Sequence, residues 1–532
     1  MPGTKAAGDA HLASPGTPWW FLLGLYLLGL VFLGALARQV TGPLDVDGAY
    51  YFLVARNVAT GRGMVIDALW HFFPPAEIPQ PAGDLWMPLP SLLMAPALLL
   101  GQTFRDGQAV QVLLAALLPL LAYRIARDEG AGPRWATLGG LITLFAGTVT
   151  VHWLDTDCFT TYALAGGAAL YAMGRSAGDS RWLAAGGLLG GLAAVTRNDG
   201  VLLLAVLWAQ ALLVARRERR QPAWNWLLLG SALFLLPVLL WEGRNLLAFG
   251  RSSPVPPAFF LTMRDYRHLF DSRPTVDWSG FWRQGLGTFV SLRLAALKAS
   301  LTVLLADLQV WAILPLAVAL AGLRRRPALW PAFLYLPVLF LVLNGAFPLL
   351  VQHGTWSRSL SAFLPAGFAC TALGLQRTVE RLLHWRPALP SRLLHSTLLT
   401  LGAGVTLLMG GIAIQSQFRS AIAHPAAWQQ IGNWLAANTV TGDVVMAQDP
   451  MAILLYAGRP GVGVPYEELP LLLDLARSYR ASRLVLLGHA RTLLPPNLQD
   501  LYEAGSAQEP GFSQGPFTLL WRQGESQIYG LW

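Results

Sequence analysis

The stretch Asp45-Val-Asp47-Gly-Ala-Tyr50-Tyr51 follows directly on the first long apolar segment of the chain, Trp19 to Ala37. Acidic residues just past a membrane exit sit in water at the bilayer edge, where a carboxylate keeps its charge and can face a substrate carried by a lipid. A second acidic pair, in Asp155-Thr-Asp157, comes at the end of another apolar run. Because only 13% of the residues are charged, these two clusters at membrane boundaries predict one composite site.

The composition indicates an integral membrane protein. Of the 532 residues, 54% are hydrophobic, and apolar stretches repeatedly reach the length needed to cross about 30 Å of hydrocarbon. The net charge of +9 comes almost wholly from arginines that cluster between apolar segments, which is the positive-inside pattern, so no nucleic-acid partner is expected. The two cysteines, Cys158 and Cys370, lie in or beside apolar runs, and no disulfide framework is expected.

The arginine clusters set the predicted topology. We expect the following clusters to face the cytoplasm: Arg124/Arg127/Arg134, Arg175/Arg181, residues 216–220, residues 324–326, and Arg377/Arg381/Arg386/Arg392. The candidate spans between them are 19–38, 108–125, 135–153, 159–174, 182–196, 200–215, 225–241, 301–321, 328–351, 360–376 and 396–415. These about eleven crossings, starting from an N-terminus inside, place the C-terminus outside.

Three apolar stretches need separate treatment. The proline-rich run 88–104 is interpreted as a juxtamembrane or partly inserted helix, because counting it as a span would put the loop with Asp155 inside. Thr196-Arg-Asn-Asp-Gly200 divides the run 182–215 into two short helices that meet at an outer-face turn. The first apolar segment is long for a signal peptide, so we expect an uncleaved span.

The chain divides into two predicted parts. Residues 1–420 form a transmembrane domain with outer loops at 39–107 and 242–300. Residues 421–532 alternate helical stretches (424–437, 467–479) with strand-like ones (443–446, 483–487) and have a turn at 458–460, which predicts a small α/β domain. The expected fold is therefore mainly α and polytopic, with an extracytoplasmic α/β domain at the C-terminus.

Asp47 allows two compatible interpretations. It precedes a helical pattern that runs to Asn57, and an aspartate at a helix N-terminus binds free N–H groups and contributes roughly 0.5–2 kcal/mol. A carboxylate beside Tyr50 and Tyr51, aromatic residues that can stack on a sugar ring, also fits a general base.

Several short motifs lie in order at predicted outer-face positions. They are Asp45–Tyr51 with Ala55-Arg-Asn57 and Gly61-Arg-Gly63, Trp86-Met-Pro-Leu-Pro-Ser91, Asp155-Thr-Asp157, Thr196-Arg-Asn-Asp-Gly200, Arg244-Asn245 with Phe249-Gly250, and Gly458-Arg459-Pro460. These motifs span most of the chain, and in them it resembles the GT-C glycosyltransferases. These are polytopic enzymes that move sugars from polyprenyl phosphate or pyrophosphate carriers. The resemblance implies that Asp47 (or Asp45) is the catalytic base and that Asp155 and Asp157 form the second acidic pair of this superfamily.

Departures from the superfamily pattern limit which group of GT-C enzymes the chain resembles. The sequence Trp-Trp-Asp-Tyr-Gly, by which oligosaccharyltransferases recognise their acceptor, does not occur, so transfer of a whole glycan to asparagine is not expected. The turn at 196–200 also lacks the proline common there in relatives. The chain is more similar to the group using single-sugar carriers, such as protein O-mannosyltransferases, the lipid A aminoarabinose transferase and bacterial cell-envelope sugar transferases. This implies a lipid, glycan or protein acceptor at the extracytoplasmic face of the inner (plasma) membrane.

Asp155 and Asp157 are interpreted as metal ligands or as hydrogen-bonding groups that orient the acceptor. Oxygen ligands in this spacing suit Mg²⁺ or Mn²⁺, although relatives with monophosphate carriers often dispense with metal. The alternative is a solvated loop in which Asp157 caps the next helix. His152, beside Trp153, is expected to be a packed or interfacial residue.

The carrier phosphate needs a cation at the headgroup level. The outer-side candidates are Arg197, Arg244, Arg251, Arg264, Arg267 and Arg358. Arginine suits phosphate through its bidentate fork, while the alternative for each is a side chain that reaches from apolar surface into water. Arg358 is the first choice because it shares a short loop with His353 and Trp356, and Arg244 is the second.

The implied reaction is transfer of a hexosyl or pentosyl group with inversion. Asp47 would deprotonate the acceptor hydroxyl while arginines or a metal hold the departing phosphate. Phosphate is a good leaving group, so no second carboxylate is needed as general acid. Two other classes stay open: a secondary transporter, which should have inverted repeats and broken segments at mid-depth, and a non-catalytic scaffold with the same fold.

Overall fold

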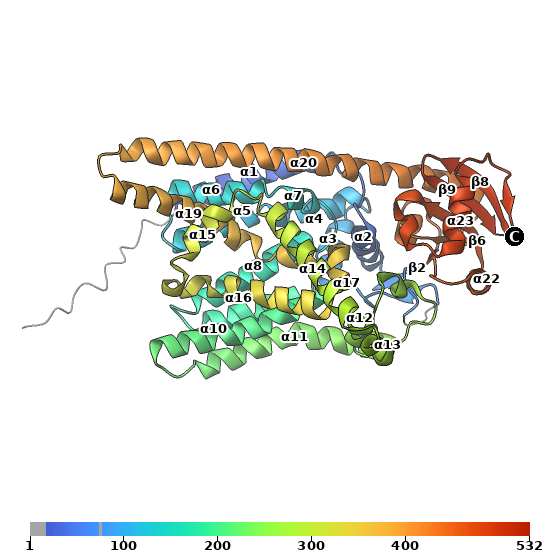
Figure 1. Ribbon diagram of the computed structural model, residues 1–532, viewed down its shortest axis with the longest axis horizontal. Coiled ribbons are helices and arrows are strands. Elements are labelled where there is room, and N and C mark those ends of the chain that lie inside the picture. Colours follow the sequence, from blue (N-terminus) through green and yellow to red (C-terminus); the bar gives the residue numbers. More distant parts are fainter. Residues whose placement is uncertain (1–16, 74–76, 532) are drawn as a thin grey trace, which may run out of the picture.

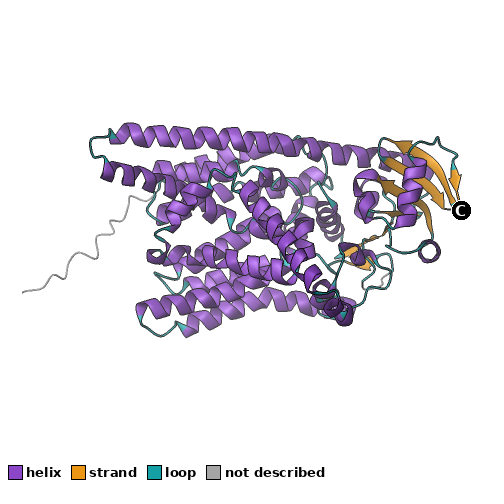
Figure 2. Ribbon diagram, viewed as in Figure 1, coloured by secondary structure: helices purple, strands orange, loops and turns teal. Residues whose placement is uncertain are grey.

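The computed structural model describes residues 17–73 and 77–531. Figure 1 shows an elongated body of helices with a smaller unit at the end that carries the C-terminus, and Figure 2 shows that the strands gather at this end. The N-terminus-inside prediction concerns residues 1–16, which lie outside the described residues.

The helical body runs from α1 to α20. Its helices are α1 (Trp19–Ala37), α2 (Val46–Ala59), α3 (Leu89–Leu98), α4 (Phe104–Ala115), α5 (Leu118–Asp128), α6 (Pro133–Leu144), α7 (Thr148–His152), α8 (Phe159–Arg175), α9 (Trp182–Ala194), α10 (Leu202–Glu218), α11 (Trp224–Phe249), α12 (Pro257–Thr262), α13 (Trp278–Arg283), α14 (Leu286–Asp307), α15 (Ile313–Leu320), α16 (Trp330–Leu339), α17 (Pro348–Leu350), α18 (Trp356–Leu360), α19 (Leu364–Trp385) and α20 (Ser391–Asn438). Short turns used below are η1 (Asn198–Val201), η3 (Leu323–Arg325) and the π-helical η6 (Val351–Thr355).

Within the described residues, seven helical segments are long and apolar enough to cross a membrane. They are Trp19–Ala37, Phe104–Asp128, Asn198–Glu218, Trp224–Phe249, Leu286–Asp307, Pro327–Asn344 and Ser391–Asn438. A pair bent by 61°, Pro348–Leu360 with Leu364–Trp385, would make an eighth. The chain is thus an integral membrane protein, but the predicted count of about eleven spans is not confirmed.

The differences from the predicted spans have local causes. The predicted span 135–153 is two helices, α6 and α7, because the chain breaks at Gly147, whose φ of 68° favours glycine. The predicted outer loop 242–300 is also shorter, since α14 already begins at Leu286. The secondary structure of two predictions is confirmed: α3 is a ten-residue helix within the run 88–104, and η1 separates α9 from α10. The juxtamembrane position of α3 and the outer-face position of η1 stay predictions.

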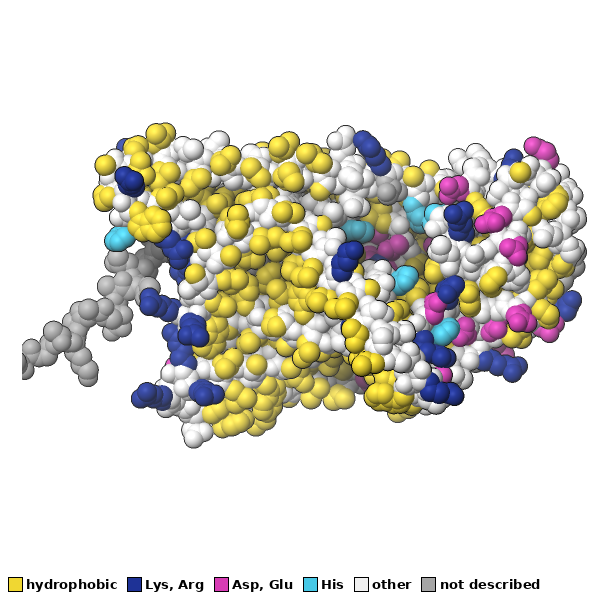
Figure 3. All heavy atoms as spheres, viewed as in Figure 1, with side chains coloured by type: hydrophobic (Ala, Val, Ile, Leu, Met, Phe, Trp, Pro, Cys, Tyr) yellow, Lys and Arg dark blue, Asp and Glu magenta, His cyan; other side chains and the backbone are white. Residues whose placement is uncertain are grey.

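The predicted cytoplasmic arginine clusters meet at one end of the bundle. Asp128 binds both Arg124 and Arg175, and Glu129 binds Arg326 at 2.9 Å. Figure 3 shows basic side chains gathered at the end away from the C-terminal unit. A common end is what the predicted topology requires, while the side of the membrane that it faces stays a prediction.

The C-terminal unit is built around one sheet. Its helices are α21 (Pro450–Ala457), α22 (Leu469–Ser478) and α23 (Pro496–Gly505), and its strands are β4 (Val444–Ala447), β5 (Gly461–Gly463), β6 (Ala481–Leu487), β7 (Ser513–Gln514), β8 (Phe517–Gln523) and β9 (Ser526–Leu531). With β2 (Ala68–Leu69) at one edge, the strand order is β2-β5-β4-β6-β9-β8-β7, parallel from β2 to β6 and antiparallel from β6 to β7. This arrangement agrees with the α/β alternation predicted for residues 421–532.

The sheet ties the C-terminal unit to the helical body. Its edge strand β2 (Ala68–Leu69) belongs to the first outer loop, where Ala68 pairs with Gly461; the same loop contains the small ladder of β1 (Val65–Ile66) and β3 (Gln80–Pro81). In addition, α20 continues without a break through the predicted domain boundary at residue 420. The first outer loop is therefore held between the membrane helices and the C-terminal sheet.

A glycine lets α2 approach the second acidic loop closely. A Cβ atom at Gly48 would lie 2.7 Å from Asp155 Oδ2, closer than a real Cβ can come. The N-terminal turn of α2 therefore packs directly on the carboxylate of Asp155. This approach brings the two acidic clusters, which lie far apart in the sequence, into one site.

Candidate active site

The first acidic cluster lies at the start of α2. Asp45 is the N-cap residue, and its Oδ1 accepts a hydrogen bond from Gly48 N at 3.0 Å. The interpretation of Asp47 as the N-cap is therefore wrong, because the helix already begins at Val46. Asp47 stands in the first helical turn, where the helix dipole favours a negative charge. Its carboxylate is not used as the cap and binds other side chains.

Two side chains hold the carboxylate of Asp47. The indole N–H of Trp86 donates to Oδ1 at 2.8 Å, and Nη2 of Arg358 lies 2.9 Å from Oδ2. The Trp86 ring stacks on Tyr50 with a centroid distance of 4.1 Å. Loss of solvation raises the pKa of the Asp47 carboxyl, although Arg358 opposes this rise. The carboxylate is thus a stronger base than a free aspartate and has a fixed orientation.

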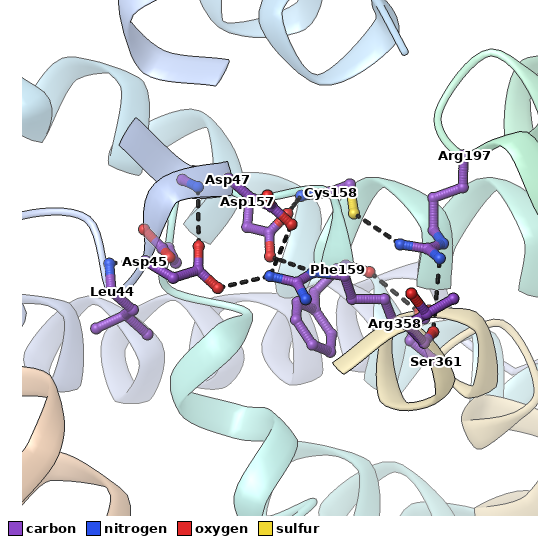
Figure 4. Close-up of polar contacts among 12 residues, drawn as sticks. Leu44, Asp45, Asp47, Asp157, Cys158, Phe159, Arg197, Arg358 and Ser361 are labelled. Carbon is purple, nitrogen blue, oxygen red and sulfur yellow. Dashed lines mark hydrogen bonds and ion pairs between the residues drawn. The ribbon is translucent and has the colours of Figure 1, made fainter. Parts of the chain in front are cut away.

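Arg358, on α18, joins three carboxylates. Its Nη2 binds Asp45 Oδ2 at 2.5 Å and Asp47 Oδ2 at 2.9 Å, while its Nε binds Asp157 Oδ2 at 2.9 Å. Figure 4 shows the guanidinium between Asp45 and Asp157. The side chain is only 11% exposed, so these ion pairs are poorly screened by water. Arg358 therefore assembles the site that the sequence predicted from separate motifs.

One nitrogen of Arg358 makes no contact with a protein acceptor in the described part of the chain. Among the described residues, its Nη1 has no hydrogen-bond or ion-pair partner. Gly354 lies against this nitrogen with a φ of 90°, and a Cβ there would come within 2.8 Å of Nη1. Glycine thus provides both the backbone turn and the space beside the guanidinium.

The second acidic pair is buried, and the alternative of a solvated loop is wrong. Asp155 and Asp157 are both fully buried. Asp155 accepts hydrogen bonds from Leu44 N at 3.2 Å and Thr156 N at 2.7 Å, and burial raises the pKa of its carboxyl well above the ordinary value. Asp157 Oδ1 accepts from Cys158 N, and its Oδ2 binds Arg358. Asp155 therefore links the two acidic segments, while Asp157 takes part in the charged group.

Three of the carboxylates could hold a metal ion. Asp45, Asp47 and Asp157 each offer an oxygen, and these oxygens lie within 4.8 Å of one another. Such oxygen ligands suit Mg²⁺ or Mn²⁺. The sequence predicts Asp155 and Asp157 as the ligand pair, and only Asp157 belongs to this group. Since Arg358 contacts all three carboxylates, a metal ion would share them with the guanidinium or replace it.

Arg244 and the two tyrosines make contacts that differ from those expected of a phosphate ligand and of sugar-stacking rings. Arg244 donates to the carbonyls of Ala82 (2.6 Å) and Met64 (3.0 Å), so it fixes the first outer loop instead of joining Arg358. Tyr50 and Tyr51 are 2% and 3% exposed, whereas stacking on a sugar needs an exposed ring face. Tyr50 instead supports Trp86, and its hydroxyl accepts from Gly83 N at 2.6 Å.

His353 and Arg197 lie next to α18, the helix that carries Arg358. His353, in η6, stacks on Tyr266 of the second outer loop with a centroid distance of 3.5 Å. Arg197 pairs with Asp199 at 2.8 Å and donates to Ser359 at 3.3 Å. Figure 4 also shows its contact with the thiol of Cys158.

Two residues of the site were not assigned a role from the sequence. Trp86 belongs to a quoted motif, but no pattern shows that its indole reaches Asp47. Asp449 caps α21 through Ala452 N at 3.0 Å; burial raises its pKa to about 7, and the negative charges of Asp45 and Asp47 add to this rise. Asp449 followed by Pro450 is a helix-start signal, so the sequence predicts Asp449 as an N-cap. The sequence does not show that this cap lies near Asp45 and Asp47. The C-terminal unit thus contributes a carboxyl to the surroundings of the site.

The site is open on one face. Figure 3 shows a hollow between the helical body and the C-terminal unit, in which acidic and histidine side chains are visible. The side chains of Asp45 and Asp47 are 35% and 22% exposed, so water or a ligand can reach them.

No protein-family model and no curated protein matches the chain. Solved structures do match its fold. ArnT from Cupriavidus metallidurans in the apo state has a TM-score of 0.63 and 15% identity, over 96% of this chain and 98% of that one. ArnT from Cupriavidus metallidurans bound to undecaprenyl phosphate has a TM-score of 0.61 and 15% identity, over 97% and 98%. The Archaeoglobus fulgidus oligosaccharyltransferase tethered with an acceptor peptide has a TM-score of 0.57 and 13% identity, over 89% and 70%. These neighbours are GT-C glycosyltransferases, and the predicted resemblance is confirmed at the level of the fold.

Proposed function

We propose that this protein is an inverting membrane glycosyltransferase that moves a sugar from a polyprenyl-phosphate donor to an acceptor hydroxyl. The observation that carries the proposal is the carboxylate of Asp47, which is oriented by Trp86 and Arg358 and has a side chain that is 22% exposed. The GT-C fold supports it, since one neighbour was solved with undecaprenyl phosphate and another with an acceptor peptide. The donor sugar would be a hexosyl or pentosyl group.

Asp47 is the general base of the proposed reaction. Its pKa is raised, so the carboxylate accepts a proton more readily than a free aspartate as the acceptor hydroxyl attacks the anomeric carbon. Asp45 is less suited, because one of its oxygens caps α2.

Arg358 would bind the departing phosphate through Nη1. Its other nitrogens already bind carboxylates, so the side chain is held in place before the donor arrives. Charge that develops on the phosphate oxygens would then meet a preorganised cation. When bound at Asp45, Asp47 and Asp157, Mg²⁺ or Mn²⁺ would supply additional positive charge to the same phosphate.

The proposed setting is the extracytoplasmic face of the inner membrane. The arginine-rich end would face the cytoplasm, and the hollow and the C-terminal unit would face outward. The acceptor would be a lipid, glycan or protein that reaches the hollow from this side.

The proposal is tested by offering the purified protein a panel of radiolabelled polyprenyl-phosphate sugars with extracted envelope lipids and peptides. We expect label transfer from at least one donor and a product of inverted anomeric configuration. The Asp47→Asn variant should fold but lose transfer by roughly 10²–10⁴-fold. Full transfer by a well-folded Asp47→Asn protein would refute the base, and a complete lack of transfer from every donor would favour a scaffold.

A further inference from the structure

A second cationic site lies at the end of the bundle away from the hollow. A shallow cavity of ≈ 440 Å³ is lined by Ala321, Gly322, Arg324, Arg325, Arg377 and Arg381. All the charged residues that line it are arginines. Figure 3 shows that this end of the molecule is rich in basic side chains, whereas the acidic side chains gather near the C-terminal unit. The cavity is therefore separate from the candidate active site.

Two distant segments form the cavity. One is η3 with the turn that follows α15, and the other is the last part of α19. Arg377 Nη1 donates to the carbonyl of Ala319 at 2.5 Å, which fixes this guanidinium on the cavity wall. A Cβ at Gly322 would lie 3.3 Å from the same nitrogen, so the glycine gives the side chain room. Arg377 and Arg381 lie one turn apart and so share a face of α19.

The carboxylates of this end are occupied elsewhere. Glu129 binds Arg326, Glu218 binds Arg220, and Glu380 accepts a hydrogen bond from Gln376 at 2.7 Å. Within residues 17–73 and 77–531, no carboxylate pairs with Arg324, Arg325 or Arg381. Four guanidinium groups around one cavity repel one another unless an anion lies between them. Glu129 and Glu380 act on Arg377 from a distance, but within the described residues no carboxylate forms an ion pair with any of the four arginines.

We propose that this cavity binds the phosphate of an anionic phospholipid. Arginine forks match phosphate oxygens, and basic pockets between membrane helices are suited to lipid headgroups. The neighbouring helix α15 is apolar and exposes Leu314 by 78%, so it offers a surface for the acyl chains of a lipid whose headgroup fills the cavity. The positive-inside rule accounts for arginines at this end, but not for their convergence on one cavity from two segments.

The test uses the purified full-length chain in a neutral detergent. Native mass spectrometry would count bound lipid after addition of cardiolipin, phosphatidylglycerol or phosphatidylcholine, and inorganic phosphate would be added as a competitor. The cavity variant is Arg325→Gln with Arg381→Gln, because both residues are exposed and neither side chain has an ion-pair partner among residues 17–73 and 77–531, so folding should survive. The matched control is Arg386→Gln with Arg392→Gln, two exposed arginines that follow the cavity residues in the chain.

We expect the wild-type chain to retain the anionic lipids but not phosphatidylcholine. The cavity variant should bind them at least about tenfold more weakly, since it loses two charge-assisted contacts, while the control should bind like the wild type. Equal losses in both variants would show general surface attraction and overturn the proposal. Displacement of the lipid by inorganic phosphate at equal concentration would identify a free-phosphate site instead and would also overturn it.

Discussion

Replacing Trp86 by phenylalanine tests how the base is held. Phenylalanine keeps an aromatic ring against Tyr50 but removes the N–H that donates to Asp47 Oδ1 at 2.8 Å. A hydrogen bond to a charged group is worth about 1.5–3 kcal/mol. Because about 1.4 kcal/mol corresponds to a factor of ten, kcat should fall by about ten- to 150-fold if the whole bond serves the orientation of the base.

The variant should change the turnover number and not donor binding. Arg358 keeps all its contacts, so the KM for the lipid donor should stay unchanged. The Trp86 hydrogen bond lowers the pKa of Asp47 by stabilising the ionised form, and its loss therefore raises that pKa. Since the reaction needs ionised Asp47, activity is lost as pH falls through this pKa. The acid limb of the pH–rate profile should consequently move to higher pH.

The matched control is Trp70→Phe. Trp70 packs against Trp86 with a centroid distance of 5.3 Å and against Phe270 at 5.2 Å, so the substitution disturbs the same aromatic group without removing a bond to Asp47. A further check combines Trp86→Phe with Asp47→Asn, where the tryptophan change should cost nothing more. An unaltered kcat in Trp86→Phe, or a full additional loss in the double variant, would contradict the orienting role.

Three other changes probe the site and the topology. Arg358→Ala should weaken donor binding by about 1.5–3 kcal/mol, read as a raised KM for the lipid donor, and an unchanged KM would exclude Arg358 as the phosphate ligand. Gly48→Ala places a methyl group 2.7 Å from Asp155 Oδ2 and should lower stability by about 1–3 kcal/mol in thermal unfolding, whereas Gly24→Ala, with nothing within 4 Å of its Cβ, should have little effect. Cysteines introduced one at a time in a cysteine-free background should be labelled from outside intact cells when placed in residues 440–532 and not at position 218; the reverse pattern would contradict the proposed orientation.

The site residues could be predicted where a charge is rare in its surroundings. Asp47, Asp157 and Arg358 stand out because ionisable side chains are costly within an apolar chain and are retained there mainly for function. The sequence cannot show that one guanidinium binds all three carboxylates, because that depends on how α2, α8 and α18 pack. The sequence also cannot show that the ring of Tyr50 is covered by Trp86. The sequence pattern of an aromatic residue near a helix start is the same whether its ring contacts a sugar or another side chain.

The fold was predicted less well where hydropathy and backbone geometry diverge. The mean hydropathy of residues 135–153 is high enough to predict one span, but a hydropathy average does not detect the break in the helix at Gly147. Conversely, α14 contains Arg293 and Lys298, which lower its hydropathy, so its first half was assigned to an outer loop. Strand β2 has only two residues and therefore no periodicity. Its place in the sheet follows from tertiary pairing with Gly461 and Val462.

The hydrogen bonds favour Asp47 as the proposed base among four neighbouring carboxylates. Asp45 and Asp157 each give one oxygen to a backbone N–H, of Gly48 and Cys158, and the other to Arg358. Asp155 is fully buried and accepts hydrogen bonds from the backbone N–H groups of Leu44 and Thr156, so an acceptor hydroxyl cannot reach it. Only Asp47 is held by two side chains, so its position depends on Trp86 and Arg358 instead of on the local backbone. Among the described residues, Arg358 Nη1 has no hydrogen-bond or ion-pair partner. The same guanidinium would therefore orient the proposed base through Nη2 and bind the leaving phosphate through Nη1, two nitrogens on one carbon, which would keep proton removal and phosphate departure close together.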